Sequence, residues 1–386
     1  MLDLQRILSY LGKSTGYGAL ALWIHHLKEI GRIIQYKSKQ YNGPALKISA
    51  GVSAAEVYDA LEKQGYTALA GEGPSVGLAG GYIFAGGHSA ASSKLGLASD
   101  QILEVEGILA NGTSFTASPN VNLDIFWFLS GSGAGGTIAY VRNVTFKIFK
   151  NFSISGALLT LPFKGILSDD EFWSLLEIWH SITPKITDAG AFDYAIYMAG
   201  YFQLRLVFAP ELSEAQAVAS IKPLLDHIDK LKVKHPSLRY NLTSSSYPTF
   251  NRAYKGLFPT FESPGSSFQW TSRLIPRAIM EKQPKEVIKT DRKLYVEGAV
   301  MNEAVMNPNL KVAKPVIANS VLLAWRTVSM HLVVAKPYND SAPFQTNVDA
   351  RTFITESWTS ALEELATALT GGETYMNEAD AEDPHW

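Results

Sequence analysis

Two clusters of glycine in the first 150 residues constrain this chain more than any other feature. Residues 74–100 (PSVGLAGGYIFAGGHSAASSKLGLASD) hold six glycines and almost no charge, and residues 131–136 (GSGAGG) form the second cluster. Glycine permits positive φ angles and lets a ligand approach the main chain closely. Successive exposed N–H groups can also form a concave anion site. The clusters therefore indicate either a backbone cradle for a phosphate-bearing cofactor or a set of tight turns between short strands.

Neither cluster completes a standard nucleotide-binding motif. The first contains neither GxGxxG nor GxxxxGK[ST]. The second spells GxGxxG, but residues 137–149 after it read as a strand, whereas a βαβ unit needs a helix there. Spacing alone therefore leaves both interpretations open.

Composition narrows the class of protein. The chain has 386 residues, which favours about two domains, and it is 46% apolar and 18% charged, as in ordinary globular proteins. A net charge of −2 gives no electrostatic reason to bind nucleic acid, and no apolar run is long enough to span a bilayer. The absence of cysteine excludes disulfides and thiolate sites. We therefore expect neither nucleic acid nor a membrane as a partner.

The sequence pattern changes near residue 151, from glycine-rich stretches to regular helix and strand patterns. Ser168 and Glu171 form a capping-box pattern that opens an amphipathic helix. Residues 192–198 and 202–209 read as an antiparallel strand pair, and further strands are expected at 294–300 and 328–334. The second part is thus predicted to be an α+β unit built on an antiparallel sheet.

Three stretches resemble the flavin-binding core of the berberine bridge enzyme-like oxidoreductases, within the vanillyl-alcohol oxidase/p-cresol methylhydroxylase superfamily. These are residues 74–82 (PSVGLAGGY), 86–89 (GGHS) and 92–100 (SSKLGLASD). Residues 16–27, 124–131 and 375–380 also follow the order of that family. The resemblance extends over nearly the whole chain and is greatest to the fungal branch.

The resemblance implies an α+β fold with a p-cresol methylhydroxylase-type FAD-binding domain at residues 1–150. A substrate domain with an antiparallel sheet flanked by helices would follow at 151–340. Residues 341–386 would form a C-terminal segment that returns to the FAD domain.

The resemblance also assigns residues to the cofactor. Backbone N–H groups of residues 77–81 and 86–87 would face the pyrophosphate, ribityl chain and flavin ring. Tyr82 would lie near the pyrimidine edge of the flavin, and Ile138 near the adenosine side. The implied FAD contacts are Ser75, Val76, Gly77, Gly80, Gly81, Tyr82, Gly86, Gly87, His88, Ser89, Gly96 and Ile138.

The implied catalytic residues are Tyr375, Asn377 and Glu378. Hydride would pass from a small organic substrate to flavin N5, and dioxygen would reoxidise the flavin. In many family members the tyrosine acts as the base or helps to form it. A tyrosine has an ordinary pKa of about 10, so this role would require a neighbour that lowers the pKa of Tyr375.

The chain departs from the family pattern in ways that bear on the cofactor. The histidine and cysteine positions used for covalent attachment are Leu8 and Gly73, so we expect non-covalent FAD. Ala85 and Ala139 stand where glycine is usual. The resemblance further implies that the chain begins where the first FAD lobe is ending and lacks a later flavin-side segment.

Three functions follow. The first is an FAD-linked oxidoreductase that acts on an alcohol, sugar or secondary metabolite. The second is a redox-silent isomerase or cyclase on the same scaffold, with Tyr375 and Glu378 as acids. The third is a non-catalytic truncated paralogue.

Several conspicuous residues have simpler expected roles. His88 is expected to pack near the cofactor rather than to act as a base, and the pair His25-His26 lacks a third ligand, so we expect no metal. We also expect a structural hydrogen bond at Asp100, a core position for Trp127 and a solvated Lys147. Tyr194, Tyr197 and Tyr201 are expected mainly in core packing, although some could line the substrate cavity.

The sequence does not fix a compartment. Residues 1–14 lack the pattern of a signal peptide, whereas five Asn-x-Ser/Thr sequons permit glycosylation. The sequons are at Asn111, Asn143, Asn151, Asn241 and Asn339.

Overall fold

The computed structural model describes residue 18 and residues 22–258, 268–337, 341–367 and 372–385. Contacts divide the chain into two compact units. The first unit comprises Met1–Phe152, Pro248–Glu262 and Pro308–Leu323, and the second comprises Ser153–Tyr247, Ser263–Asn307 and Ala324–Trp386. The first break between the units falls between Phe152 and Ser153, two later segments belong to the first unit, and the last segment belongs to the second.

The first unit is built on a five-stranded antiparallel sheet in the order β1-β2-β6-β4-β5. Asn111-Gly112 is a dipeptide typical of hairpin turns, and it joins β4 to β5, where Gly112 has a φ of 84°. The strands are β1 (Ile34–Lys37), β2 (Asn42–Ser49), β4 (Ile102–Leu109), β5 (Ser114–Ala117) and β6 (Ala139–Lys147), and β3 (Tyr66–Thr67) pairs separately with β7 (Phe149–Lys150).

Short helices accompany this sheet. Helix α1 (Ala54–Glu62) begins at Ser53, whose capping box with Glu56 matches the sequence pattern. The other α-helices of the described first unit are α2 (Ser92–Leu95), α3 (Leu123–Leu129), α4 (Gly135–Ile138), α8 (Phe250–Leu257) and α11 (Leu310–Ala313). The later segments are tied in by specific bonds, since Tyr254 of α8 donates its hydroxyl to the carbonyl of Glu72 at 2.6 Å.

The second unit is built on a seven-stranded antiparallel sheet in the order β11-β8-β10-β9-β13-β14-β12. The predicted pair at 192–198 and 202–209 is present as β9 and β10. The strands are β8 (Ile154–Pro162), β9 (Phe192–Met198), β10 (Tyr201–Pro210), β11 (Asn241–Tyr247), β12 (Phe268–Pro276), β13 (Val300–Val305) and β14 (Val328–Pro337).

The strand predicted at 294–300 is wrong. Leu294 and Tyr295 lie in the last turn of helix α10 (Pro284–Val296), and the strand begins only at Val300. Gly298 separates the two elements with a φ of 89°. Glycine just beyond a helix end is a common termination signal. Gly298 therefore marks the end of the helix, although the tyrosine and valine residues before it favoured the prediction of a strand.

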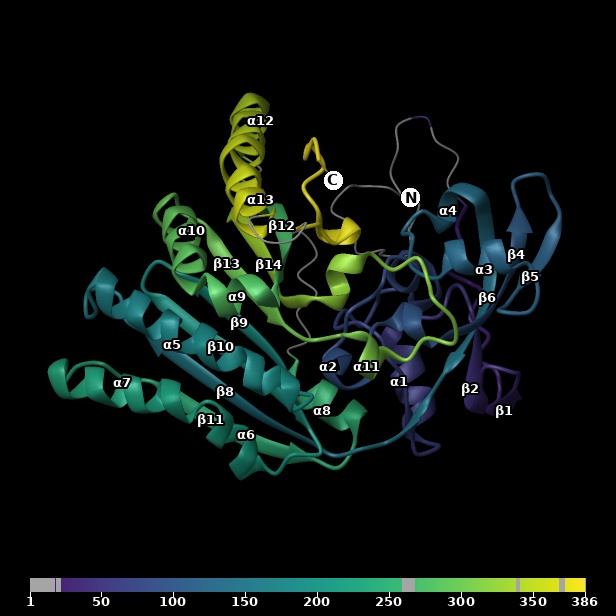
Figure 1. Ribbon diagram of the computed structural model, residues 1–386, viewed down its shortest axis with the longest axis horizontal. Coiled ribbons are helices and arrows are strands. Elements are labelled where there is room, and N and C mark those ends of the chain that lie inside the picture. Colours follow the sequence, from purple (N-terminus) through teal and green to yellow (C-terminus); the bar gives the residue numbers. More distant parts are fainter. Residues whose placement is uncertain (1–17, 19–21, 259–267, 338–340, 368–371, 386) are drawn as a thin grey trace. The chain divides into compact units, whose positions relative to one another are not determined.

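Helices cover one face of this sheet (Figure 1). Helix α5 (Asp169–Asp188) begins at the predicted Ser168 capping box and buries Phe172, Leu176 and Trp179 against the strands. The remaining α-helices of the described second unit are α6 (Glu214–Ser220), α7 (Lys222–Lys234), α9 (Arg277–Lys282), α10, α12 (Phe344–Phe353) and α13 (Ser360–Thr367). Among the described helices, none combines the length and the apolar character that crossing a bilayer requires.

Alternation along the strands separates the two faces of the sheet. Residues such as Leu332 and Met301 belong to the core beneath the helices. Their neighbours along the strands, such as His331 and Asn302, therefore point to the opposite face. We call these the helix-covered face and the opposite face.

Candidate functional site

The glycine-rich stretch is joined to the start of helix α1 by main-chain bonds. Val76 accepts from the Ala54 N–H at 2.9 Å, and Leu78 donates to the Val52 carbonyl at 3.1 Å. A π-helical turn, Leu78–Tyr82, follows, and within it Gly80 takes non-helical angles of φ −153° and ψ −142°. The local structure is therefore a tight backbone turn rather than a regular helix.

The turn at Gly86 and Gly87 requires glycine. Both residues have positive φ, and a Cβ on Gly87 would lie 2.9 Å from the carbonyl oxygen of Tyr82. The Gly86 N–H donates to Ser99 Oγ at 3.0 Å, so this group holds the turn together. Tyr82 donates its hydroxyl to the carbonyl of His88 at 2.7 Å, which fixes the ring against the turn.

The surroundings of this stretch fit a bound flavin nucleotide. A Cβ built on Gly80 meets no atom within 4 Å, so open space adjoins the main chain there. The expected contact residues with partial exposure are Ser75, Gly80, Gly81, His88 and Ile138, whereas Val76, Gly77, Tyr82, Gly86, Gly87, Ser89 and Gly96 are buried. Gly73 provides no nucleophile, and Leu8 lies outside the described residues.

Ile138 lines a hollow of about 1020 Å³ on the first unit, together with residues of α3 and Ile317. Trp127 also lines it and is 47% exposed, so the expected core position of this side chain is wrong. The helix is short and turns Phe126 and Leu129 inward instead.

Two further expectations concern Asp100 and Lys147. Asp100 makes the expected structural bonds, accepting from the Leu97 N–H at 2.9 Å and from Asn319 Nδ2 at 2.8 Å. Lys147 is not solvated, because it is 7% exposed and donates to the carbonyls of Lys314 and Asp100. Burial lowers the pKa of Lys147 to about 8, and the charge of Asp100 opposes that change.

The second unit brings the three expected catalytic residues together on the opposite face of its sheet. Asn377 donates from Nδ2 to the Tyr375 hydroxyl at 2.8 Å, and a Glu378 oxygen lies 3.4 Å from Nδ1 of His331. The Tyr375 ring packs edge-on against His331 and Trp325, at centroid distances of 5.8 and 5.3 Å. All five side chains are buried.

The electrostatics of this cluster keep the phenol protonated. Burial raises the pKa of Tyr375 far above its ordinary value, and the negative charge of Glu378 adds to the rise. The hydrogen bond from Asn377 acts in the opposite direction but is the weaker effect. Within the second unit, Tyr375 is therefore a hydrogen-bond donor at neutral pH.

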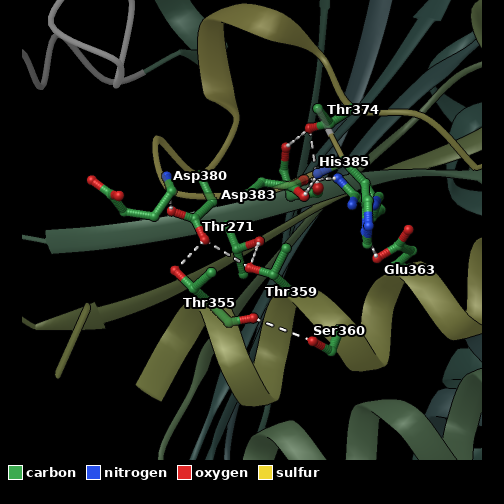
Figure 2. A network of polar contacts seen from close by, with 12 residues as sticks. Thr271, Thr355, Thr359, Ser360, Glu363, Thr374, Asp380, Asp383 and His385 are labelled. Atoms are coloured by element: carbon green, nitrogen blue, oxygen red, sulfur yellow. Dashed lines mark hydrogen bonds and ion pairs between the residues drawn. The ribbon is translucent and has the colours of Figure 1, made fainter. Parts of the chain in front are cut away.

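Residues 373–385 form what we call the C-terminal strap, and many polar bonds fix it. Thr374 bonds to Ser272 through their hydroxyls at 3.0 Å. Figure 2 shows that Asp380 accepts from Thr355 and Thr359, at 2.7 and 2.9 Å. Contacts at Thr374 and Asp380, on either side of Tyr375 in the sequence, therefore fix the part of the strap that carries Tyr375.

A second polar cluster lies under the helix-covered face. Glu303 accepts from Trp179 Nε1 at 2.8 Å and from the Tyr197 hydroxyl at 3.0 Å, and it bonds to His180 at 2.8 Å. Burial raises the pKa of the nearby Asp291 to about 7. Tyr197 thus takes the expected core position, whereas Tyr194 lies on the opposite face and bonds to Asn302.

Sequence reasoning missed His331 and Trp325 as neighbours of Tyr375. Their positions are more than forty residues from Tyr375, and no motif links them. The pairing of β14 with β12 and β13 brings His331 to the site. The alternation of β14 places His331 on the correct face, but only the strand register identifies its partners.

Comparisons with known proteins show what this chain is similar to. A family model described as "FAD binding domain" matches residues 8–118. An FAD-linked oxidoreductase of Phaeosphaeria nodorum, sthB, is 36% identical over 245 residues, which are 64% of this chain and 76% of the relative. An FAD-linked oxidoreductase of Aspergillus clavatus, patO, is 34% identical over 379 residues, covering 98% of this chain and 64% of the relative.

Another relative has a different kind of name. The bifunctional decalin synthase calF of Penicillium decumbens is 34% identical over 382 residues, covering 96% of this chain and 64% of the relative. Several of the curated relatives are thus longer, and the chain spans about 64% of their length.

A solved structure has the same fold. The VAO-type flavoprotein MtVAO615 of Myceliophthora thermophila C1 superposes with a TM-score of 0.86 at 28% identity, over 98% of this chain and 68% of that one.

Proposed function

Because the chain belongs to the FAD-linked oxidoreductase family, we propose that it binds FAD without a covalent bond and oxidises a small organic substrate. The substrate would be an alcohol, a sugar or a secondary metabolite, and dioxygen would be the final electron acceptor. The observation that carries the proposal is the buried group of Tyr375, Asn377 and Glu378 in a chain whose glycine-rich stretch matches an FAD-binding domain.

The glycine-rich stretch would hold the cofactor. The open space beside Gly80 and the partial exposure of Ser75 and Gly81 would let the main chain contact the dinucleotide. FAD supplies the hydride acceptor, flavin N5, for a two-electron oxidation. Leu8 and Gly73 offer no nucleophile, so hydrogen bonds and packing would retain the cofactor.

The second unit would supply proton transfer and orientation. The neutral Tyr375 phenol would donate a hydrogen bond to the substrate oxygen, and Asn377 would orient the phenol through its 2.8 Å bond. The substrate hydroxyl proton would pass to the Glu378–His331 pair, whose atoms lie 3.4 Å apart. This assignment differs from the tyrosine-base role because burial strongly disfavours a phenolate.

The first test is the absorbance of the protein purified without added cofactor. A flavin band that passes into the supernatant after acid precipitation would support non-covalent FAD, and peroxide-coupled substrate screening would follow. A colourless protein that also fails to take up added FAD would refute the proposal for this chain.

Two variants then separate the roles at the site. Tyr375→Phe removes the donor and keeps the ring, so we expect a loss of kcat by about 10²- to 10⁴-fold at unchanged flavin content. Glu378→Gln removes the carboxylate of the proton-accepting pair and should lower kcat at unchanged flavin content. The exposed Glu286→Gln on α10 serves as the control and should leave kcat unchanged.

A cyclase or isomerase is the second candidate, and the decalin synthase relative is the observation that favours it. In that case Tyr375 and Glu378 would act as acids without net oxidation. Turnover under argon, with no peroxide formed, would favour this candidate over an oxidase.

A further inference from the structure

We propose that Arg273 is a positioning residue that fixes Tyr375 and Asn377 from the other side of the sheet, by anchoring the C-terminal strap. The catalytic consequence rests on the proposed function. The structural consequence, which is local order at Tyr375, does not depend on it.

The alternation of β12 decides on which face of the sheet each of its side chains lies. Arg273 pairs in register with Leu332, a core residue beneath the helices, so its side chain points to the helix-covered face. Thr271 does the same, because it bonds to Thr359 at 2.7 Å. Leu274 pairs with His331 and therefore points to the opposite face, where Tyr375 lies.

The first half of the strap runs along the free edge of β12, which is the last strand of the sheet. The carbonyl of Glu373 accepts the Leu274 N–H at 2.9 Å, and Thr374 bonds to Ser272. Tyr375 and Glu378 then contact His331 on the opposite face. Edge N–H groups that a strap covers are also protected from pairing with other chains.

The second half of the strap is anchored on the helix-covered face. Asp380 accepts from Thr355 and Thr359 of the helical segment above that face (Figure 2). Arg273 Nη1 lies 2.6 Å from Asp383 Oδ2, and both residues are only 2% exposed. Between Glu378 and Asp380 the chain thus passes around the edge of β12, from one face to the other.

This geometry makes the ion pair a tether for the candidate site. If Arg273 is removed, Asp383 becomes a buried carboxylate without its guanidinium partner. Such a charge is strongly unfavourable, and the strap can avoid the cost by moving Asp383 into water. Moving Asp383 loosens the chain on which Tyr375 and Asn377 are held, although Arg273 itself lies on the other face.

The experiment compares Arg273→Met, Arg273→Lys and a matched control, Arg277→Met. Arg277 pairs with Asp188 and Glu281 in the same unit, and neither partner belongs to the strap. In the purified protein, with or without bound flavin, hydrogen exchange at residues 373–378 should accelerate at least tenfold in Arg273→Met. The control should leave that segment unchanged, and Arg273→Lys should restore most of the protection because it keeps the charge.

Kinetics provide the second measurement. Arg273→Met should lower kcat by about a hundredfold with little change in KM, since a displacement of about 1 Å at a catalytic group has an effect of that size. Arg273→Lys should recover part of the loss. Unchanged exchange at 373–378 in a folded Arg273→Met protein would overturn the proposal.

Two further outcomes are distinguishable. If Arg273→Met does not fold, the double variant Thr355→Val/Thr359→Val weakens the same anchor at Asp380, and exchange at 373–378 must then rise for the proposal to stand. If the wild-type protein retains no flavin, the proposed function fails, whereas the exchange result still decides whether Arg273 holds the strap.

Discussion

The two units prepare their candidate sites by opposite means. In the first unit the main chain forms the site, and glycine permits the turns at Gly86, Gly87 and Gly96. In the second unit, buried side chains such as Tyr375 and Asn377 form it, and the buried pair Arg273–Asp383 anchors the strap that carries them. The site of the first unit should therefore be sensitive to substitutions that add a Cβ to glycine. The site of the second unit should be sensitive to substitutions that remove a buried charge.

This difference also predicts how each unit responds to pH. The second unit retains protons under its helices, where the pKa values of Asp291 and His180 are raised. The first unit buries Lys147, whose pKa is lowered. A rise in pH should therefore change the stability of the two units in opposite directions, in the second unit between about pH 5 and 8 and in the first between about pH 8 and 10.

The largest predicted effect is that of Glu303→Ala in the second unit. The change removes the acceptor of Trp179, His180 and Tyr197, and unpaired buried groups of this kind destabilise by about 4 kcal/mol. Urea unfolding with hydrogen exchange on α5 and β13 measures the loss. The exposed Glu286→Ala should change stability by less than about 0.5 kcal/mol, and equal effects of the two would contradict the importance of the network.

A pair of glycine variants tests the first unit in the same way. Gly96→Ala should destabilise by about 3 kcal/mol, because its φ is 84° and the new Cβ would contact the backbone of Ala313. Gly80→Ala meets open space and should cost less than about 1 kcal/mol, while it weakens FAD retention. Similar losses of stability in both variants would mean that Gly80 is a packing residue.

The second unit should become less stable as pH rises through neutrality. Burial raises the pKa of Asp291 to about 7. For His180, burial opposes a rise in pKa, but the charge and hydrogen bond of Glu303 and the charge of Asp291 outweigh it. Groups with a raised folded-state pKa stabilise fully at low pH, and their contribution is lost as pH rises through that pKa.

We expect the free energy of unfolding of the second unit to fall by about 2 kcal/mol between pH 5 and pH 8. Hydrogen exchange in α10 and α5 measures this loss. Asp291→Asn should flatten this profile. A wild-type profile that rises with pH would show that Asp291 is ionised in the folded state.

The smallest effect concerns Lys147 in the first unit. Burial lowers the pKa of Lys147 to about 8 from an ordinary value of 10.5. The folded state therefore loses the proton first, and the first unit should gain about 1 kcal/mol of stability as pH rises from 8 to 10. Exchange in β6 should show the gain, and Lys147→Met should abolish the pH dependence.

The sequence predicted those features that depend on local backbone chemistry. The N-cap at Ser53, the capping box at Ser168 and the turn at Asn111-Gly112 each satisfy requirements within four residues. The strand at 294–300 was wrong, since leucine, tyrosine and valine suit a buried helix face equally well. Trp127 is exposed and Lys147 is buried, the reverse of what was expected, because packing by distant segments decides burial.

The polar anchors of the second unit could not be predicted from the sequence. Arg273 and Asp383 are 110 residues apart, and neither belongs to a spacing pattern. Asn377 was predictable as a neighbour of Tyr375 because the two lie within one short motif. The tyrosine's raised pKa was not, since it results from burial that the folded chain alone creates.

The separation of the strap from its strand also has a consequence for synthesis on the ribosome. Strand β12 emerges about 100 residues before the strap, which at 5–20 residues per second is a delay of about 5–20 seconds. During that interval the Leu274 N–H and its neighbours on the edge have no strap to cover them. At this stage the exposed edge of β12 could pair with strands of other chains. A chaperone that binds this edge would therefore be most useful during this interval.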